Sequence, residues 1–136
     1  MGKVLGIDYG TKRTGIAITD SMKIIATGLT AIPTHTLDDF ISDITIKENI
    51  ECFVVGSASN LDGKDTDSTP HIRGFLRRLQ KSYPNTLLCQ IDERFTSKIA
   101  KRVILESGVK KEKRRDRWLV DKVSATLILQ SYLDSK

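Results

Sequence analysis

The sequence predicts an α/β fold in which helices flank a mixed five-stranded sheet, with three antiparallel N-terminal strands followed by parallel strands. Three β-rich runs joined by short turns occupy the first 33 residues, which is typical of an antiparallel meander. Beyond Pro33, single helical segments separate the later apolar runs, and a connection through a helix indicates parallel pairing. The expected element order is therefore β-β-β-α-β-α-β-α-α.

The chain of 136 residues is expected to form one domain over residues 1–136, long enough to bury a core. Hydrophobic residues make up 39% and charged residues 29%, as in ordinary soluble proteins. No apolar run is long enough to span a bilayer and the N-terminus lacks a signal-peptide pattern, so we expect a cytoplasmic protein with no membrane partner. Cys52 and Cys89 lie in apolar runs expected to be central strands, without metal-binding spacing, which favours reduced core cysteines.

The first strand is expected over residues 4–8 and delivers Asp8 to a turn. Gly10 and Gly15 bracket residues 11–14, and a second apolar run follows at once, so a hairpin is expected with Asp8 near its open rim. A carboxylate at the end of a buried strand costs free energy unless it is paired, hydrogen-bonded or bound to a cation. Asp8 is therefore a candidate functional residue, although an Asp beside a Gly can also serve only the turn.

The third strand is expected over residues 24–32 and is closed by Pro33. Thr36 and Asp39, three positions apart, resemble a capping box at the start of a helix. One face of that helix is expected to carry four apolar residues, which are Leu37, Phe40, Ile41 and Ile44.

The fourth strand includes the apolar residues 53–55 and leads into a loop over residues 56–63. Thr69 and Pro70 form a typical N-cap and first-turn pair, and the helix that they begin is expected to end at Pro84. The apolar face of this second helix comprises Ile72, Phe75, Leu76, Leu79 and Tyr83.

The fifth strand is expected over residues 87–91, directly ahead of Asp92 and Glu93. A helix from about residue 97 to residue 107 follows and is closed by Gly108. Trp118 is expected in the core rather than as a stacking platform for a base. The last helix is expected to turn inward Val120, Val123, Leu127 and Tyr132.

Three acids are candidate catalytic and metal-binding residues: Asp8 after the first strand, Glu93 after the last strand and Asp121 early in the final helix. They would converge if the first and fourth strands were neighbours, and their mutual repulsion would then require a cation. An all-oxygen ligand set favours Mg²⁺ or Mn²⁺, and two such ions could stabilise both oxygens of a phosphodiester displacement. Each acid could also have only a structural role. Asp121 could interact favourably with the positive N-terminal end of the helix dipole, and Glu93 could form an ion pair with a neighbouring basic side chain.

Positive charge is concentrated ahead of Asp121. The chain has a formal net charge of +5, and residues 110–117 contain six basic and two acidic residues. A basic segment beside carboxylates would hold nucleic-acid phosphates, although such runs are often only solvated. Lys12 and Arg13 in the first turn are two further candidates for phosphate contact. The candidates within the segment are Lys110, Lys111, Lys113, Arg114, Arg115 and Arg117.

Several ordered motifs then carry a family resemblance. They are residues 6–15 (GIDYGTKRTG), 54–56 (VVG), 60–63 (NLDG), 92–97 (DERFTS) and Val120-Asp121 leading to residues 128–133 (ILQSYL). Through these motifs the chain resembles, nearly end to end, the YqgF/RuvX family of bacterial RNase H-like nucleases. Members of that family are described as pre-16S rRNA nucleases or as Holliday-junction-resolvase-like proteins.

The resemblance implies an RNase H-like fold and a metal-dependent endonuclease site with Asp8, Glu93 and Asp121 on the family's acidic positions. It also implies a cytoplasmic role in maturing the 5′ end of 16S ribosomal RNA, as a monomer or a homodimer, with branched DNA as the other possible substrate. One departure is plain, because Gly56-Ser57-Ala58-Ser59 stands where the family usually has Gly-Leu-Pro-Leu. The altered loop bears on substrate grip or partner packing and leaves the acids untouched.

Three alternatives remain open on the sequence. A junction-resolving DNA endonuclease would need a two-fold dimer that presents paired sites to a four-way junction. A non-catalytic RNA-binding module would keep the fold and the basic segment. An ATPase is suggested by residues 8–11 (DYGT), which resemble the first phosphate motif of actin-like and sugar kinases. Those enzymes close two such domains around the nucleotide, whereas this chain has one and lacks a GxxxxGK[ST] loop.

Overall fold

The computed structural model describes residues 2–57, 69–92, 102–103 and 117–135. Five strands form one sheet in the order β3-β2-β1-β4-β5, with β1–β2 and β2–β3 antiparallel and β1–β4 and β4–β5 parallel. The predicted mixed sheet, with its first and fourth strands as neighbours, is thereby confirmed. The elements are β1 (Lys3–Asp8), β2 (Arg13–Thr19), β3 (Ala26–Pro33), a 3₁₀ turn (Thr34–Thr36), α1 (Leu37–Lys47), β4 (Ile50–Ser57), α2 (Thr69–Ser82), β5 (Leu87–Asp92) and α5 (Arg117–Asp134).

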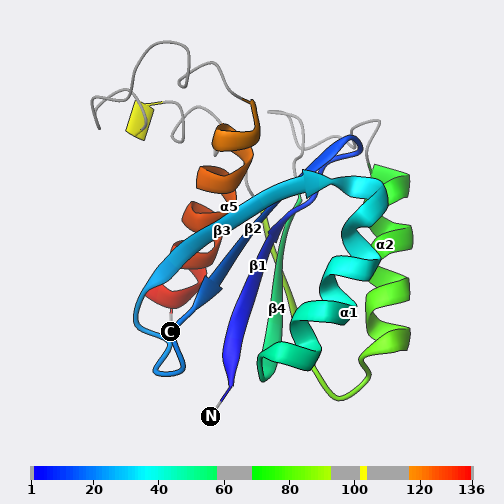
Figure 1. The fold of residues 1–136 in the computed structure, drawn as a ribbon, viewed down its shortest axis with the longest axis horizontal. Coiled ribbons are helices and arrows are strands. Elements are labelled where there is room, and N and C mark those ends of the chain that lie inside the picture. Colours follow the sequence, from blue (N-terminus) through cyan, green and yellow to red (C-terminus); the bar gives the residue numbers. More distant parts are fainter. Residues whose placement is uncertain (1, 58–68, 93–101, 104–116, 136) are drawn as a thin grey trace.

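Three layers make up the molecule, with α1 and α2 on one face of the sheet and α5 on the other (Figure 1). Side chains alternate along a strand, so β1 contributes to both cores. Leu5 and Ile7 belong to the core beneath α1 and α2, whereas Val4 belongs to the core beneath α5. The predicted apolar faces of α1 and α2 are confirmed, since every residue of both is buried or partly buried in the first core.

Small residues let α5 lie close to the sheet. Gly6, Ala17 and Gly28 are register partners across β1, β2 and β3, and they form a row under α5. A Cβ at Gly6 would lie 2.9 Å from Leu129 Cβ, and one at Gly28 would lie 2.8 Å from Thr126 Oγ1. The row therefore acts as a shallow groove in which the helix rests.

The side of α5 that faces the sheet differs in part from the prediction. Val120 is buried and Tyr132 partly buried, as expected, but Val123 and Leu127 pack beside Val120 in a separate small cluster. Apolar residues surround this helix on more than one side, so their spacing alone does not select the inward face. The residues of α5 that face the sheet at the glycine row are Ser124, Ala125, Ile128 and Leu129, and they are buried, as Val120 is.

The predicted capping box at α1 is wrong. The Thr36 side chain makes no capping bond to the helix, and its hydroxyl donates instead to the Pro33 carbonyl at 2.7 Å. A 3₁₀ turn over Thr34–Thr36 leads directly into the helix, and the Leu37 N–H donates to the Thr34 carbonyl. The helix therefore begins by continuing a tighter turn rather than at a free N-cap.

Other predictions differ only at the ends of elements. β3 begins at Ala26 and includes Pro33, and α2 begins at Thr69 itself. Cys52 is buried in β4, as expected, while Cys89 is partly exposed on β5, which is an edge strand rather than a central one. Residues 102 and 103 are helical, and the rest of the helix predicted over 97–107 lies outside the described residues. Among the helices that the structure describes, none has the length and apolar character needed to cross a membrane.

Candidate active site

Asp8 is the last residue of β1, and it lies at the edge of the sheet where the parallel strands end. Its register partners are Gly15 on β2 and Gly56 on β4. Because side chains alternate along a strand, Asp8 faces the same side as Val4 and Gly6, which contact α5. The carboxylate is partly buried. The structure therefore places Asp8 at the rim of the sheet, on the side covered by α5.

Asp121 reaches the same rim from α5. A Cβ built on Gly15 would lie 1.9 Å from the backbone oxygen of Asp121, so the helix backbone rests directly on this strand position. Only a glycine permits so close an approach. Since Gly15 is the register partner of Asp8, the two acids lie on the same face and at the same end of the sheet. The structure thus brings together two of the three acids predicted from the sequence.

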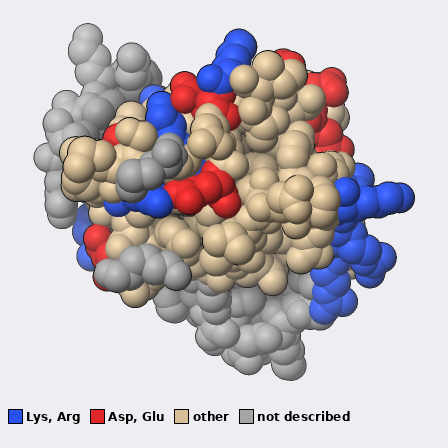
Figure 2. All heavy atoms as spheres, turned by 90° about the horizontal axis from the view of Figure 1, so that it is seen from below, with Lys and Arg blue, Asp and Glu red and all other residues tan. Residues whose placement is uncertain are grey.

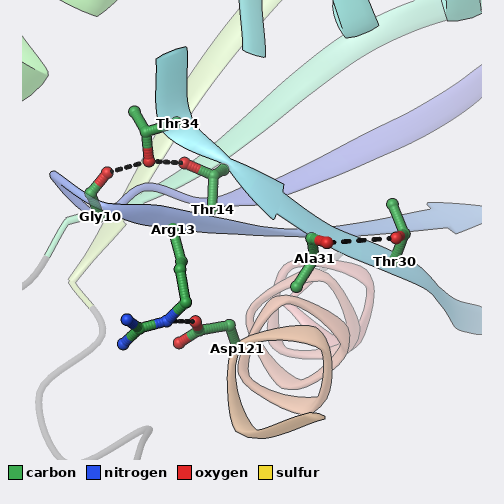
Figure 3. Close-up of polar contacts among 7 residues, drawn as sticks. All are labelled: Gly10, Arg13, Thr14, Thr30, Ala31, Thr34 and Asp121. Atoms are coloured by element: carbon green, nitrogen blue, oxygen red, sulfur yellow. Dashed lines mark hydrogen bonds and ion pairs between the residues drawn. The ribbon is translucent and has the colours of Figure 1, made fainter. Parts of the chain in front are cut away.

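Arg13 pairs with Asp121 at this rim. The Arg13 Nε–H donates to Asp121 Oδ2 at 2.9 Å, and the side chains are 25% and 22% exposed. Figure 3 shows the two terminal nitrogens of Arg13 on the side away from the carboxylate. A charge-assisted bond in a partly buried place fixes the carboxylate more firmly than an exposed pair would. Arg13 was predicted as a phosphate contact, and here it also holds a candidate metal ligand.

Trp118 lies one turn ahead of Asp121 on α5, and the prediction that it is a core residue is wrong. Its side chain is 42% exposed, because the first turn of α5 extends past the sheet. The guanidinium carbon of Arg13 lies 5.8 Å from the centroid of the Trp118 ring, within the range of a cation–π contact. Arg13 is therefore positioned by both a carboxylate and an aromatic ring.

Two threonines that the sequence analysis did not single out hold the turn between β1 and β2. Thr34 Oγ1 donates to the Gly10 carbonyl at 2.5 Å, so the 2.9 Å bond between Thr14 Oγ1 and Thr34 Oγ1 must be donated by Thr14. The Thr34 N–H also donates to the Lys12 carbonyl at 3.0 Å. These bonds, drawn in part in Figure 3, fix the turn that carries Lys12 and Arg13.

Tyr9 packs on the face of the sheet that α1 and α2 cover, opposite to the face of Asp8. It follows Asp8 directly, and its ring stacks on Phe75 of α2 with the centroids 5.0 Å apart. Burial raises the pKa of Tyr9, and this effect exceeds the opposing one of the nearby Arg78. The phenol is therefore protonated at neutral pH and serves as a neutral anchor beside Asp8.

The third acid follows β5. Ser57 and Asp92 are register partners on β4 and β5, so β5 ends at the same edge of the sheet as β1. Glu93, the next residue, lies outside the described residues, and the convergence of all three acids stays a prediction. Among the residues that are described, no group of three or more His, Cys, Asp or Glu side chains could hold a metal ion.

Most of the residues predicted to contact nucleic acid are either exposed at the surface or outside the residues that the structure describes. Lys12 is exposed in the turn, and Arg117 is exposed at the first position of α5. In the altered loop, Gly56 and Ser57 belong to β4 beside Asp8, while residues 58–63 lie outside the described ranges. The predicted contacts outside the described residues are Lys110, Lys111, Lys113, Arg114 and Arg115.

The donor set at the rim fits a hard divalent cation. Asp8 and Asp121 offer carboxylate oxygens, which Mg²⁺ and Mn²⁺ prefer. The sequence contains only two His and two Cys residues, and the exposed His35 and His71 lie on the 3₁₀ turn and on α2. The two cysteines pack in the core beneath α5, at positions further down the strands than Asp8, so the chemistry of this rim differs from that of a zinc site.

Comparisons with known sequences agree along the whole chain. A family model described as RuvX, Holliday junction resolvase, matches residues 2–135. A Porphyromonas gingivalis protein named "Putative pre-16S rRNA nuclease" is 51% identical over 135 residues, covering 99% of this chain and 98% of that protein. A Flavobacterium johnsoniae protein of the same name is 47% identical over 136 residues, covering 100% and 99% of the two chains.

Solved structures share the fold at low sequence identity. The structure titled "T. thermophilus RuvC in complex with Holliday junction substrate" matches with a TM-score of 0.60 and 15% identity, covering 99% of this chain and 96% of that one. A second RuvC structure from Thermus thermophilus matches with a TM-score of 0.54 and 10% identity, covering 97% and 96%. At such identities the likeness concerns the fold alone, and it confirms the predicted RNase H-like architecture.

Proposed function

This chain belongs to the RuvX family, and from that premise we propose that it is a metal-dependent endonuclease that processes the 5′ end of pre-16S ribosomal RNA. The names of relatives that are 51% and 47% identical over nearly their whole length support the substrate. The observation that carries the proposal is that Asp8 pairs with Gly15, on which the backbone of Asp121 rests, so both acids lie at one rim of the sheet. Carboxylates gathered at a strand end are the arrangement that phosphodiester hydrolysis with divalent metals requires.

In the proposed site, Asp8, Glu93 and Asp121 hold Mg²⁺ or Mn²⁺. When bound, such an ion supplies charge stabilisation to the attacking and leaving oxygens of the scissile phosphodiester. Arg13 fixes the orientation of the Asp121 carboxylate through its Nε–H, at 2.9 Å. In the proposal its terminal nitrogens, which lie away from Asp121 in Figure 3, bind a phosphate oxygen of the substrate.

The remaining basic residues position the substrate backbone. Lys12 projects from the turn that Thr34 holds, and Arg117 begins the helix that carries Asp121. Phosphate contacts of this kind fix the register of a nucleic acid without reading its sequence. The segment over residues 110–117 adds to this grip in the proposal. The proposal also includes that residues 1–136 form one domain and that the protein acts in the cytoplasm.

The first test is cleavage of a 16S precursor RNA by the wild type and by Asp8→Asn, with Mg²⁺ or Mn²⁺. We expect metal-dependent cutting that falls at least about a hundredfold in the variant, since even residues that only support metal ligands are worth 10–100-fold. Asp43→Asn, at an exposed position of α1, is the matched control and should cut like the wild type. A wild type that cuts neither this RNA nor any other with either metal would overturn the proposal.

A second candidate is a junction-resolving DNA endonuclease, which the description of the matched family model favours. The same carboxylates could serve either backbone, but resolution needs a two-fold dimer with paired sites. A synthetic four-way DNA junction is therefore included beside the RNA. Paired symmetric nicks in the junction, without cutting of the RNA, would replace the first candidate by the second.

A further inference from the structure

Helix α2 is a second concentration of positive charge, apart from the segment ahead of Asp121. Over Thr69–Ser82 it carries four basic residues and no acidic one. Residues 110–117, with six basic and two acidic residues, have the same excess of four positive charges. The rest of the chain contains 12 basic and 15 acidic residues. The positive net charge of the protein therefore resides in these two segments. Figure 2 shows Lys and Arg side chains gathered on the side of the molecule where α2 lies in Figure 1.

Three of the four basic residues form a stripe. Arg73, Arg77 and Lys81 are all exposed and follow one another at intervals of four residues, so they share one face of the helix. Like charges at this spacing repel, and α2 offers no acid to offset them. The opposite face of the helix is the apolar one, with Ile72, Phe75 and Leu79 buried.

The fourth basic residue shows which way the stripe points. Arg78 turns toward α1, where its Nε donates to Asp38 Oδ2 at 3.2 Å, and its guanidinium lies 6.0 Å from the Phe75 ring centroid. Arg73 and Arg77 lie on the other flank of the helix, about 100° or more around its axis from Arg78. Arg73 and Arg77 therefore face away from α1, whereas Lys81, about 60° from Arg78, lies nearer to α1 and lines a pocket with Asp38.

The stripe is held in a fixed relation to the candidate active site. Tyr9, the neighbour of Asp8, stacks on Phe75 with an interplanar angle of 20°. α2 follows β4, which ends beside Asp8, and it runs back toward the start of β5 at Leu87. Arg73 is thus at the rim end of α2, and the stripe leads away from the rim over about 12 Å, since a helix rises 1.5 Å per residue.

We propose that the stripe formed by Arg73, Arg77 and Lys81 binds the phosphate backbone of a double-stranded RNA arm that extends from the cleavage site. The inference rests on the proposed function. In a B-DNA duplex each strand advances about 3.4 Å per phosphate, and an A-form RNA duplex rises less per phosphate, so a stripe of about 12 Å is long enough to face roughly three phosphates or more. Exposed guanidinium and ammonium groups suit phosphate oxygens, and binding removes the repulsion along the helix. Such a surface favours substrates with a structured arm over short single strands.

The test compares the double variant Arg77→Gln/Lys81→Gln with Lys3→Gln/Lys47→Gln, which removes the same charge from β1 and α1. Arg73 is kept because it takes part in another interaction within the protein. Fluorescence anisotropy measures binding to a 20-base-pair RNA duplex and to a DNA duplex of the same sequence, in EDTA, over a range of salt concentrations. We expect the salt slope on RNA to fall by about 2 in the α2 variant, about one per lost phosphate contact, and to stay unchanged in the control.

The outcomes separate this inference from the function on which it rests. If the wild type binds neither duplex, the stripe is overturned, and the proposed function is decided separately by cleavage of the 16S precursor RNA. If the wild type binds RNA and the α2 variant matches the control, only the stripe is overturned, and α2 is a solvated face or serves another kind of partner. A slope that falls on DNA but not on RNA would assign the stripe to a DNA arm and overturn the RNA assignment.

Discussion

The two ends of α5 rest on the same face of the sheet and hold opposite kinds of chemistry. At the N-terminal end, Asp121 and Arg13 form an ion pair whose side chains are 22% and 25% exposed. Toward the C-terminal end, Cys52 Sγ lies 3.8 Å from Tyr132 Oη beside a cavity of about 380 Å³. Burial raises the pKa of Cys52 to about 11 and also raises the pKa of Tyr132.

The difference follows from how far each end extends beyond the sheet. At the rim, Gly15 lets the helix backbone touch β2, and the charged side chains of Arg13 and Asp121 stay partly exposed beside it. At the other end, the thiol and the phenol lie over β4 and stay neutral, and the charged pair of Lys23 and Glu51 remains at the cavity mouth, partly exposed. At the rim the ion pair lies at the same end of the sheet as a second carboxylate, Asp8, whereas the ion pair at the other end lies beside a neutral thiol and phenol.

The largest effect is expected when the close approach at the rim is broken. In Gly15→Val, the new side chain would begin 1.9 Å from the Asp121 backbone oxygen, so α5 must move away from β2. We expect a loss of at least about 3 kcal/mol in the free energy of unfolding, at the upper end for overpacked sites. Urea unfolding measures it.

Gly74→Ala is the matched control for that variant. Gly74 lies within α2, and the nearest atom to its added Cβ is Arg78 Nη1 at 3.7 Å. The change should stabilise the protein by roughly 0.5–1 kcal/mol, because alanine favours a helix interior. If Gly15→Val were as stable as the wild type, α5 would not press on β2 at the rim, and the contrast between the two ends of the helix would lose its basis.

The neutral end of α5 predicts a dependence of stability on pH. The Cys52 thiol has a folded pKa of about 11 against a usual value of 9.0, with burial as the main cause. A raised pKa in the folded state means that the stabilisation is complete below about pH 9 and is lost as the pH rises toward 11. A difference of about two pH units between the folded and the usual pKa corresponds to about 2–3 kcal/mol in the free energy of unfolding.

The measurement is the difference in unfolding free energy between the wild type and Cys52→Ala from pH 7 to pH 11. That difference should shrink by about 2 kcal/mol over the upper part of the range. Titration of the lysines and of the tyrosines remote from Cys52 is common to both proteins and cancels. Cys52 also raises the pKa of Tyr132, so both proteins carry Tyr132→Phe in this comparison. A difference that stays constant with pH would show that the thiol ionises freely in the folded state, and the two ends of α5 would then be less distinct.

Local patterns were sufficient for most of the fold and for one acid of the site. The apolar runs predicted all five strands, and the spacing of apolar residues predicted the buried faces of α1 and α2. Asp8 could be located because the end of an apolar run is visible in the sequence. The basic stripe on α2 is also visible in the sequence, from the spacing of four residues between its members.

Contacts between distant residues were out of reach of such patterns. Arg13 and Asp121 are 108 positions apart, and Thr34 lies 24 positions from Gly10, so no local signal pairs them. Trp118 was misplaced because an aromatic residue before an apolar helix looks the same whether the helix starts inside the core or past the sheet edge. Only the register of α5 on the glycine row decides between these cases.

The ion pair at the rim gives the smallest and most selective test of the comparison. A double-mutant cycle with Arg13→Ala and Asp121→Ala isolates their interaction from the contact of Arg13 with Trp118. We expect a coupling free energy of about 1–2 kcal/mol, measured by urea unfolding in EDTA, because both groups are mostly buried and the bond is charge-assisted. The reference cycle uses Lys3 and Glu48, which are 2.9 Å apart with 31% and 39% of their side chains exposed. That more hydrated pair should give about 0.2–1 kcal/mol. A rim coupling no larger than the reference would mean that Arg13 does not hold Asp121 in place, and the proposed orientation of the metal ligand would then need another source.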